Sequence, residues 1–158
     1  MSTAEILIIH GIAAFFATLA FAVIFNVPRK ELILCGLCGM LSQSIYEGLN
    51  LASADMLICF FAASAAVTWL SRWLAIRRCK PVTVYLISGI IPLVPGAGFY
   101  YTIYEMIAHN NSASANAAVD TFKAAGAISV AIMIVLALPP QLCGKKWERT
   151  CKNQKHQK

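Results

Sequence analysis

A long apolar run interrupted by proline and glycine is the feature that most constrains the fold of this chain. The run covers residues 81–109, and its centre, residues 89–98, has the sequence GIIPLVPGAG. In a bilayer every unpaired backbone group is costly, so non-helical backbone is tolerated only where protein covers it or where it lines a cavity. Broken helices of this kind recur at the binding sites of transporters. The run therefore predicts a break in a membrane span.

The composition agrees with a membrane setting. Of the 158 residues, 59% are hydrophobic and 13% are charged, whereas soluble domains carry about 25% charged residues. The length predicts one domain without a separate catalytic module. The net charge of +6 does not indicate nucleic-acid binding, because no basic groove is interleaved with aromatic residues. Basic residues instead gather at the ends of apolar runs, in three clusters: Arg29 with Lys30, residues 72–80, and a tail from Lys145.

The apolar runs predict five membrane spans, over residues 6–25, 32–46, 56–70, 82–109 and 121–138. The first has the roughly 20 residues that a ~30 Å hydrocarbon core requires, and the second is shorter and rich in small residues that allow close helix packing. The fourth consists of two half-helices, which are expected to cross the membrane once and to meet near its middle. We predict an all-α integral membrane protein with a transmembrane domain over residues 1–143 and a basic cytoplasmic tail over residues 144–158.

The distribution of charge predicts the orientation. Five spans place all three basic clusters on one side, and they place the connections 47–55 and 109–116 on the other. Lys123 alone falls outside this pattern, whereas four spans would scatter the clusters over both sides. The positive-inside rule then gives a periplasmic N-terminus and a cytoplasmic C-terminus. Arg72, between Trp69 and Trp73, is expected to extend its charge to the interface as a snorkelling cation.

Three short segments carry a resemblance to a known family. They are FNVP at residues 25–28, SRW at residues 71–73 and IPLVPG at residues 91–96, of which the last is the most specific. Together they resemble the small, YjjB-like membrane subunit of the threonine/serine exporter (ThrE) family, over nearly the whole chain up to the tail.

The resemblance implies export of small carboxylates across the bacterial inner membrane with a larger, YjjP-like partner subunit. Succinate is implied for the two-subunit form, and threonine and serine for the fused form. An alternative is a structural subunit that stabilises a partner forming the whole pathway. Five spans in each partner would also give the inverted repeats that are common in secondary transporters.

The break is the first candidate for a substrate site. The second half-helix is expected to begin around residues 96–98, so the positive end of its dipole would bind an anion without a buried cation. The alternative is a proline kink that serves only helix packing. Nearby tyrosines supply hydrogen-bond donors, and two serines of the second span line the path or bond neighbouring helices. The candidate residues are Pro92, Pro95, Gly96, Gly98, Tyr100, Tyr101, Ser42 and Ser44.

Two titratable residues are candidates for proton coupling. Glu105 lies one turn before the outer end of the broken span, and His10 lies near the start of the first span. Together they could exchange protons during export; an interfacial acid and a packing histidine are the alternatives. Cys35 and Cys38 form a CxxC motif, which is interpreted as two packing thiols because no second pair exists for exchange. No catalytic motif or metal-ligand cluster is present in the sequence, so no enzyme activity, catalytic residue or cofactor is expected.

Overall fold

The computed structural model describes residues 3–138, and these form helices without strands. The basic tail predicted over residues 144–158 lies outside the described residues. The helices are α1 (Thr3–Ile24), α2 (Leu32–Leu51), α3 (Met56–Arg78), α4 (Val82–Ile90), the 3₁₀ turn η1 (Ile91–Leu93), α5 (Gly96–Ile107) and α6 (Asn111–Ala137).

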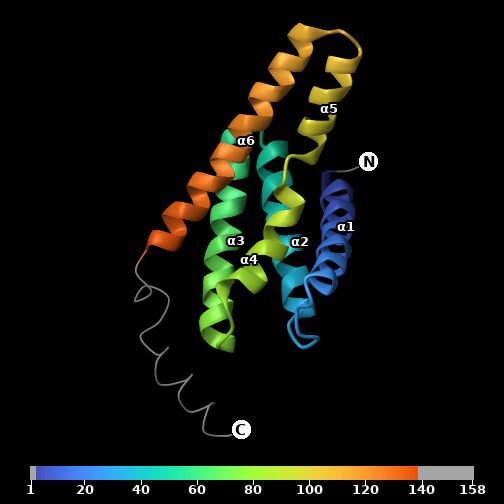
Figure 1. Ribbon diagram of the computed structural model, residues 1–158. Coiled ribbons are helices and arrows are strands. Elements are labelled where there is room, and N and C mark those ends of the chain that lie inside the picture. Colours follow the sequence, from blue (N-terminus) through green and yellow to red (C-terminus); the bar gives the residue numbers. More distant parts are fainter. Residues whose placement is uncertain (1–2, 139–158) are drawn as a thin grey trace, which may run out of the picture.

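The first four helices form a bundle in which α2 is central. Helices α1 to α4 run alternately up and down, and α2 contacts α1, α3 and α4 (Figure 1). Helix α6 packs against α3, while α5 packs on α6 and extends with the N-terminal part of α6 beyond the bundle (Figure 1). We call this projecting pair, residues 96–120, the α5–α6 arm.

Four helices, α1, α2, α3 and α6, are long and apolar enough to cross a membrane. Residues 82–93 and 96–107 pass the same test as a pair, with a bend of 43° at the break, which gives up to five spans. The predicted all-α fold with a broken fourth element is therefore confirmed. Several helices extend past the apolar segments: α2 continues to Leu51, α3 continues to Arg78, and α6 begins at Asn111. Polar residues at these ends do not interrupt helical geometry, although they end the apolar pattern.

Glycines and small residues let the bundle helices approach closely. A Cβ atom at Gly39 would clash with the Thr18 side chain of α1. A Cβ atom at Gly89 would lie 2.7 Å from Cγ2 of Val67 in α3. Van der Waals packing of this kind drives helix association where lipid competes with apolar contacts. Gly39 of α2 therefore lets α1 pack closely against α2, and Gly89 of α4 lets α4 pack closely against α3.

The break lies nearer one end of the bundle than its middle. Leu93, the last residue of η1, is buried in one apolar cluster with Phe60 and Ala63, near the N-terminal end of α3. By contrast Gly89 faces Val67, halfway along α3. The half-helices therefore join towards one end of the bundle, because α4 and η1 together follow more than half of α3.

Arg72 is not the snorkelling cation that its neighbours suggested. Its side chain is buried at 7% exposure, and its guanidinium donates hydrogen bonds to the carbonyl oxygens of Val135 and Leu138. The exposed Arg77 lies over the Trp73 ring instead, 4.2 Å from its centroid. The prediction was wrong because α6 ends beside Arg72, and the last carbonyls of a helix need donors from elsewhere.

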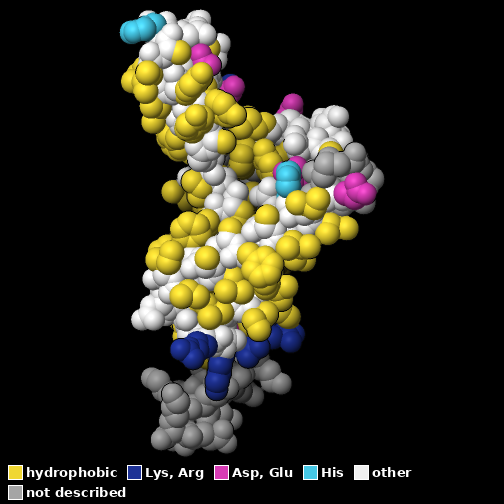
Figure 2. Space-filling model, turned by 90° about the vertical axis from the view of Figure 1, so that its right-hand side faces the viewer, with side chains coloured by type: hydrophobic (Ala, Val, Ile, Leu, Met, Phe, Trp, Pro, Cys, Tyr) yellow, Lys and Arg dark blue, Asp and Glu magenta, His cyan; other side chains and the backbone are white. Residues whose placement is uncertain are grey.

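Charges separate between the two ends of the molecule. Lys and Arg side chains gather at the end opposite the arm (Figure 2), where the exposed residues are Arg29, Lys30, Arg77, Arg78 and Lys80. Acidic side chains and histidines lie towards the other end in the same view (Figure 2). The described basic clusters therefore share one end of the bundle.

Candidate functional site

The break is built from two prolines spaced three residues apart. Pro92 lies within η1, where its fixed φ suits a tight turn, and Pro95 precedes the first residue of α5. Between them Val94 is extended, with φ −60° and ψ 124°. The amide of Val94 donates to the Ile91 carbonyl at 3.2 Å, and the amide of Gly96 donates to the Val94 carbonyl at 2.7 Å. These local bonds pair the amides of Val94 and Gly96, and α5 begins at Gly96 with its positive dipole end at the break.

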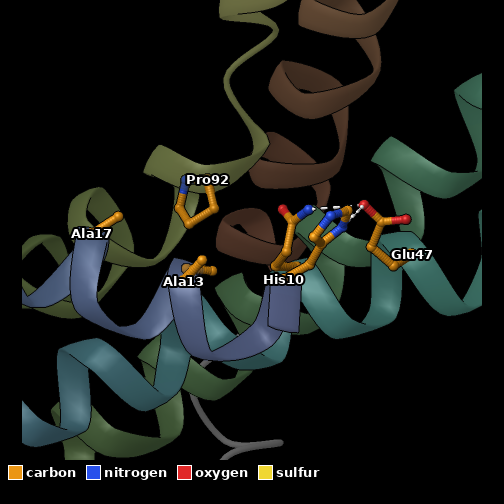
Figure 3. Close-up of a pocket in the computed structure, with 7 residues that line it drawn as sticks. His10, Ala13, Ala17, Glu47 and Pro92 are labelled. Carbon is orange, nitrogen blue, oxygen red and sulfur yellow. Dashed lines mark hydrogen bonds and ion pairs between the residues drawn. The ribbon is translucent and has the colours of Figure 1, made fainter. Parts of the chain in front are cut away.

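An open groove lies beside the break, between α1 and η1, with α2 contributing its polar side chains (Figure 3). Its volume is about 350 Å³, near the lower end of the range for small-molecule sites. Three alanines and Pro92 make most of its wall apolar. The lining residues are His10, Ala13, Ala14, Ala17, Gln43, Glu47 and Pro92. We call this feature the Pro92 groove.

Glu47 is the centre of the polar network in the Pro92 groove. Its Oε1 accepts a hydrogen bond of 2.9 Å from Nδ1 of His10 and one of 3.2 Å from Nε2 of Gln43 (Figure 3). The Glu47 side chain is 13% exposed, and that of His10 is 49% exposed. Ionised carboxylates only accept hydrogen bonds, so Nδ1 of His10 carries the donated proton. The groove therefore holds a half-buried acid with a more accessible imidazole beside it.

Glu47 was missed in the sequence, where it was assigned to a connection between spans. The structure places it inside α2, one turn after Gln43. The i, i+4 spacing of Gln43 and Glu47 on a helix that continues past residue 46 was the available signal. The structure does not bring His10 and Glu105, the two candidates for proton coupling, together. His10 pairs with Glu47, while Glu105 lies half-buried in α5, a helix that packs chiefly on α6.

The two serines of α2 make hydrogen bonds to backbone carbonyl groups. Ser42 is buried and donates to the carbonyls of Gly39 at 2.8 Å and Gly89 at 2.9 Å, which joins α2 to α4. Ser44 donates to the carbonyl of Met40 at 2.8 Å within α2. Neither serine lines the Pro92 groove. Their contacts are those of helix packing.

The candidates in α5 divide into packed and open positions. Gly98 faces α6 so closely that a Cβ atom would clash with the Thr121 side chain, whereas a Cβ atom at Gly96 would meet nothing within 4 Å. Tyr100 and Tyr101 are exposed on the arm. The Tyr100 ring stacks on Tyr104 with centroids 6.1 Å apart. Of the predicted path residues, only Pro92 lines the groove.

Cys35 and Cys38 are buried free thiols of α2 within one apolar cluster. Cys35 donates a weak hydrogen bond of 3.6 Å to the Val84 carbonyl.

Between residues 3 and 138, no group of three or more His, Cys, Asp or Glu side chains is arranged to hold a metal ion. The chemistry available at the break is thus that of one carboxylate, one imidazole, one amide and a helix end.

Comparison with known proteins gives a family. Residues 10–138 match the sequence model of the family described as "Threonine/Serine exporter, ThrE". A Mycobacterium tuberculosis (strain ATCC 25618 / H37Rv) protein described as "Probable threonine/serine exporter" is 26% identical over 77 residues, which make up 49% of this chain and 15% of that protein. The match therefore spans a small part of the length of that relative. No solved structure matches the chain.

Proposed function

This chain belongs to the threonine/serine exporter family, and we propose that it is one subunit of a two-component secondary exporter in the bacterial inner membrane. It is a multi-pass membrane protein of a transporter family and not an enzyme. The substrate is a small carboxylate that leaves the cell. Two candidates follow: succinate, from the resemblance to the YjjB-like subunit, and threonine or serine, from the family description.

One observation carries this proposal: the Pro92 groove lies at the break in the apolar run. Apolar walls with a few convergent polar groups are the usual construction of small-molecule sites. Ionisable residues inside membrane proteins are rare, and they mark substrate or ion pathways by default. His10 and Glu47 meet here beside Pro92. The positive end of the α5 dipole, at the same break, favours a carboxylate.

The partner is a larger, YjjP-like membrane subunit. The α5–α6 arm supports this part of the proposal, because α5 has no buried residue and many of its apolar and aromatic side chains are exposed. The exposed side chains include Phe99, Tyr100, Tyr101, Ile103 and Tyr104. A partner with the opposite orientation would pair with this chain as one half of an inverted repeat. Neither subunit then exports alone.

Efflux of labelled succinate and labelled threonine tests the proposal. Cells without the endogenous system would express this chain alone, the YjjP-like partner alone, or both together. We expect efflux only when both are present, and the preferred label identifies the substrate. Efflux with the partner alone would contradict the proposal and would leave this chain a stabilising subunit.

A further inference from the structure

We propose that Glu47 is the specificity-determining residue of the Pro92 groove, and that its carboxylate selects substrates by binding their ammonium group. This inference rests on the proposed export function and concerns the same groove. It separates the two candidate substrates by chemistry, since succinate carries two carboxylates and no ammonium group.

The lining of the groove contains an acid but no lysine or arginine among its described residues. It presents one carboxylate, Glu47, together with the imidazole of His10 and the amide of Gln43. A dianion placed here would meet the Glu47 charge, and His10, the one described lining side chain that can become a cation, is already paired with Glu47. Like charges at short range cost more in a half-buried site than in water, because the effective dielectric constant is lower. The groove is therefore unsuited to succinate.

The two hydrogen-bond donors beside Glu47 contact only one of its carboxylate oxygens. Both His10 and Gln43 donate to Oε1, so Oε2 is the oxygen available for a ligand's ammonium group. A hydrogen bond between two charged groups is about twice as strong as one between neutral groups. His10 and Gln43 fix the carboxylate in place before the ligand binds, which lowers the entropy cost of binding.

The shape of the groove suits a small molecule. The small side chains of Ala13, Ala14 and Ala17 leave space on the α1 side of the groove. Pro92 closes the side next to the break. The volume of about 350 Å³ accommodates a molecule of the size of threonine or serine. With its ammonium group on Glu47, such a molecule directs its carboxylate away from the acid, towards the side of the groove that Pro92 closes.

A matched pair of substrates tests the role of Glu47 directly. L-Serine and glycerate share a carboxylate and a terminal hydroxyl group, but glycerate has a hydroxyl in place of the ammonium group. Glu47→Gln keeps the shape of the side chain and an acceptor for His10 while it removes the charge. Asp55→Asn is the control, because Asp55 is an exposed acid outside the groove whose side chain caps no helix amide.

In cells with both subunits, we expect Glu47→Gln to lower serine efflux by about tenfold or more, the scale of one charge-assisted hydrogen bond. Glycerate efflux should stay unchanged or rise, Glu47→Asp should retain the serine preference, and Asp55→Asn should behave as wild type. An equal loss for serine and glycerate at normal membrane levels, or no change for either, would overturn the inference.

Binding to the purified protein separates this inference from the proposed function. The thermal stability of detergent-solubilised wild type, alone and with its partner, would be measured with millimolar L-serine or glycerate. Stabilisation by serine that Glu47→Gln abolishes supports the inference even if cells show no export, in which case the export function fails alone. Export of succinate that is independent of Glu47 leaves the function standing and overturns the inference. Absence of both serine binding and export overturns both.

Discussion

The hydroxyl of Tyr85 donates a hydrogen bond of 2.7 Å to the carboxylate of Glu31, 54 residues earlier in the chain. Both side chains are buried, at 0% and 5% exposure. The bond joins the beginning of α4 to the residue before α2. It therefore holds the first half of the broken element against the central helix, at the end of the bundle where the basic clusters gather.

Tyr85→Phe removes this bond and leaves a buried carboxylate with one acceptor unpaired. A lost partner of a buried polar group costs about 1–3 kcal/mol, so we expect a lower free energy of unfolding in detergent, measured by titration with a denaturant. Tyr101→Phe is the control, because Tyr101 is exposed on the arm. The double variant Glu31→Gln/Tyr85→Phe should lose less than the sum of the single variants, since the two groups form one interaction. Strict additivity would contradict the pairing.

Gly98→Ala should separate α5 from α6. The added Cβ atom would clash with the side chain of Thr121, and overpacking of a tight contact typically costs about 1–3 kcal/mol. Gly96→Ala is a matched control two residues earlier, where a Cβ atom meets nothing within 4 Å. The melting temperature of the purified protein measures both, and Thr121→Ala should restore part of the stability lost by Gly98→Ala. Equal melting temperatures for the two alanine variants would contradict the packing of the arm.

Arg72→Gln should destabilise the contact between α3 and α6. The guanidinium supplies donors to two carbonyl groups at the C-terminal end of α6, and each buried acceptor left unpaired costs about 1–3 kcal/mol. Arg77→Gln is the control, because Arg77 is exposed and contacts only the face of Trp73 among the interactions that the structure describes. Resistance of α6 to proteolysis in membranes reports the difference. Equal resistance for both variants would show that Arg72 is not the cap of α6.

The sequence predicted the helical elements and the break because both are local. Apolar length identifies a span, and proline at residues 92 and 95 interrupts a helix wherever it lies. The polar partners could not be predicted in the same way. The pairing of His10 with Glu47 depends on how α1 is rotated and shifted against α2, which close approach at Gly39 determines. Positions along two helices do not fix which faces meet.

The contacts of Arg72 could not be predicted for a similar reason. Its neighbours Trp69 and Trp73 indicate an interface, but the end of α6, more than 60 residues later, decides what the guanidinium contacts. Gly98 likewise resembles part of a ligand site in the sequence, whereas its close neighbour in the structure is Thr121. The sequence alone does not distinguish a glycine that makes room for a ligand from a glycine that allows a neighbouring helix to pack closely.

Alkaline phosphatase fusions test the proposed orientation, because this enzyme is active only outside the cytoplasm. Fusions after Ser53 and Ser112 should be active, and a fusion after Lys80 should be inactive, as the grouping of basic residues at one end requires. The fusion at Ser112 also decides whether residues 82–107 form one bent span or a re-entrant loop. An inactive fusion there would mean that the bent pair returns to the side from which it entered, and that the chain has four spans.

Gly96→Leu tests whether the substrate passes the break. A Cβ atom added at Gly96 would meet nothing within 4 Å, and Gly96 is the first residue of α5, where no left-handed backbone is required. Leucine should therefore leave the melting temperature and the membrane level of the protein nearly unchanged, in contrast to Gly98→Leu. If the path runs past the start of α5, the new side chain narrows it, and efflux of the preferred substrate should fall by about tenfold or more, on the scale of small misplacements at catalytic sites. Pro95→Leu should add a loss of the bend, because it restores the amide that a continuous helix needs. Full export by Gly96→Leu at wild-type protein levels would place the path elsewhere and leave the break with a role in packing alone.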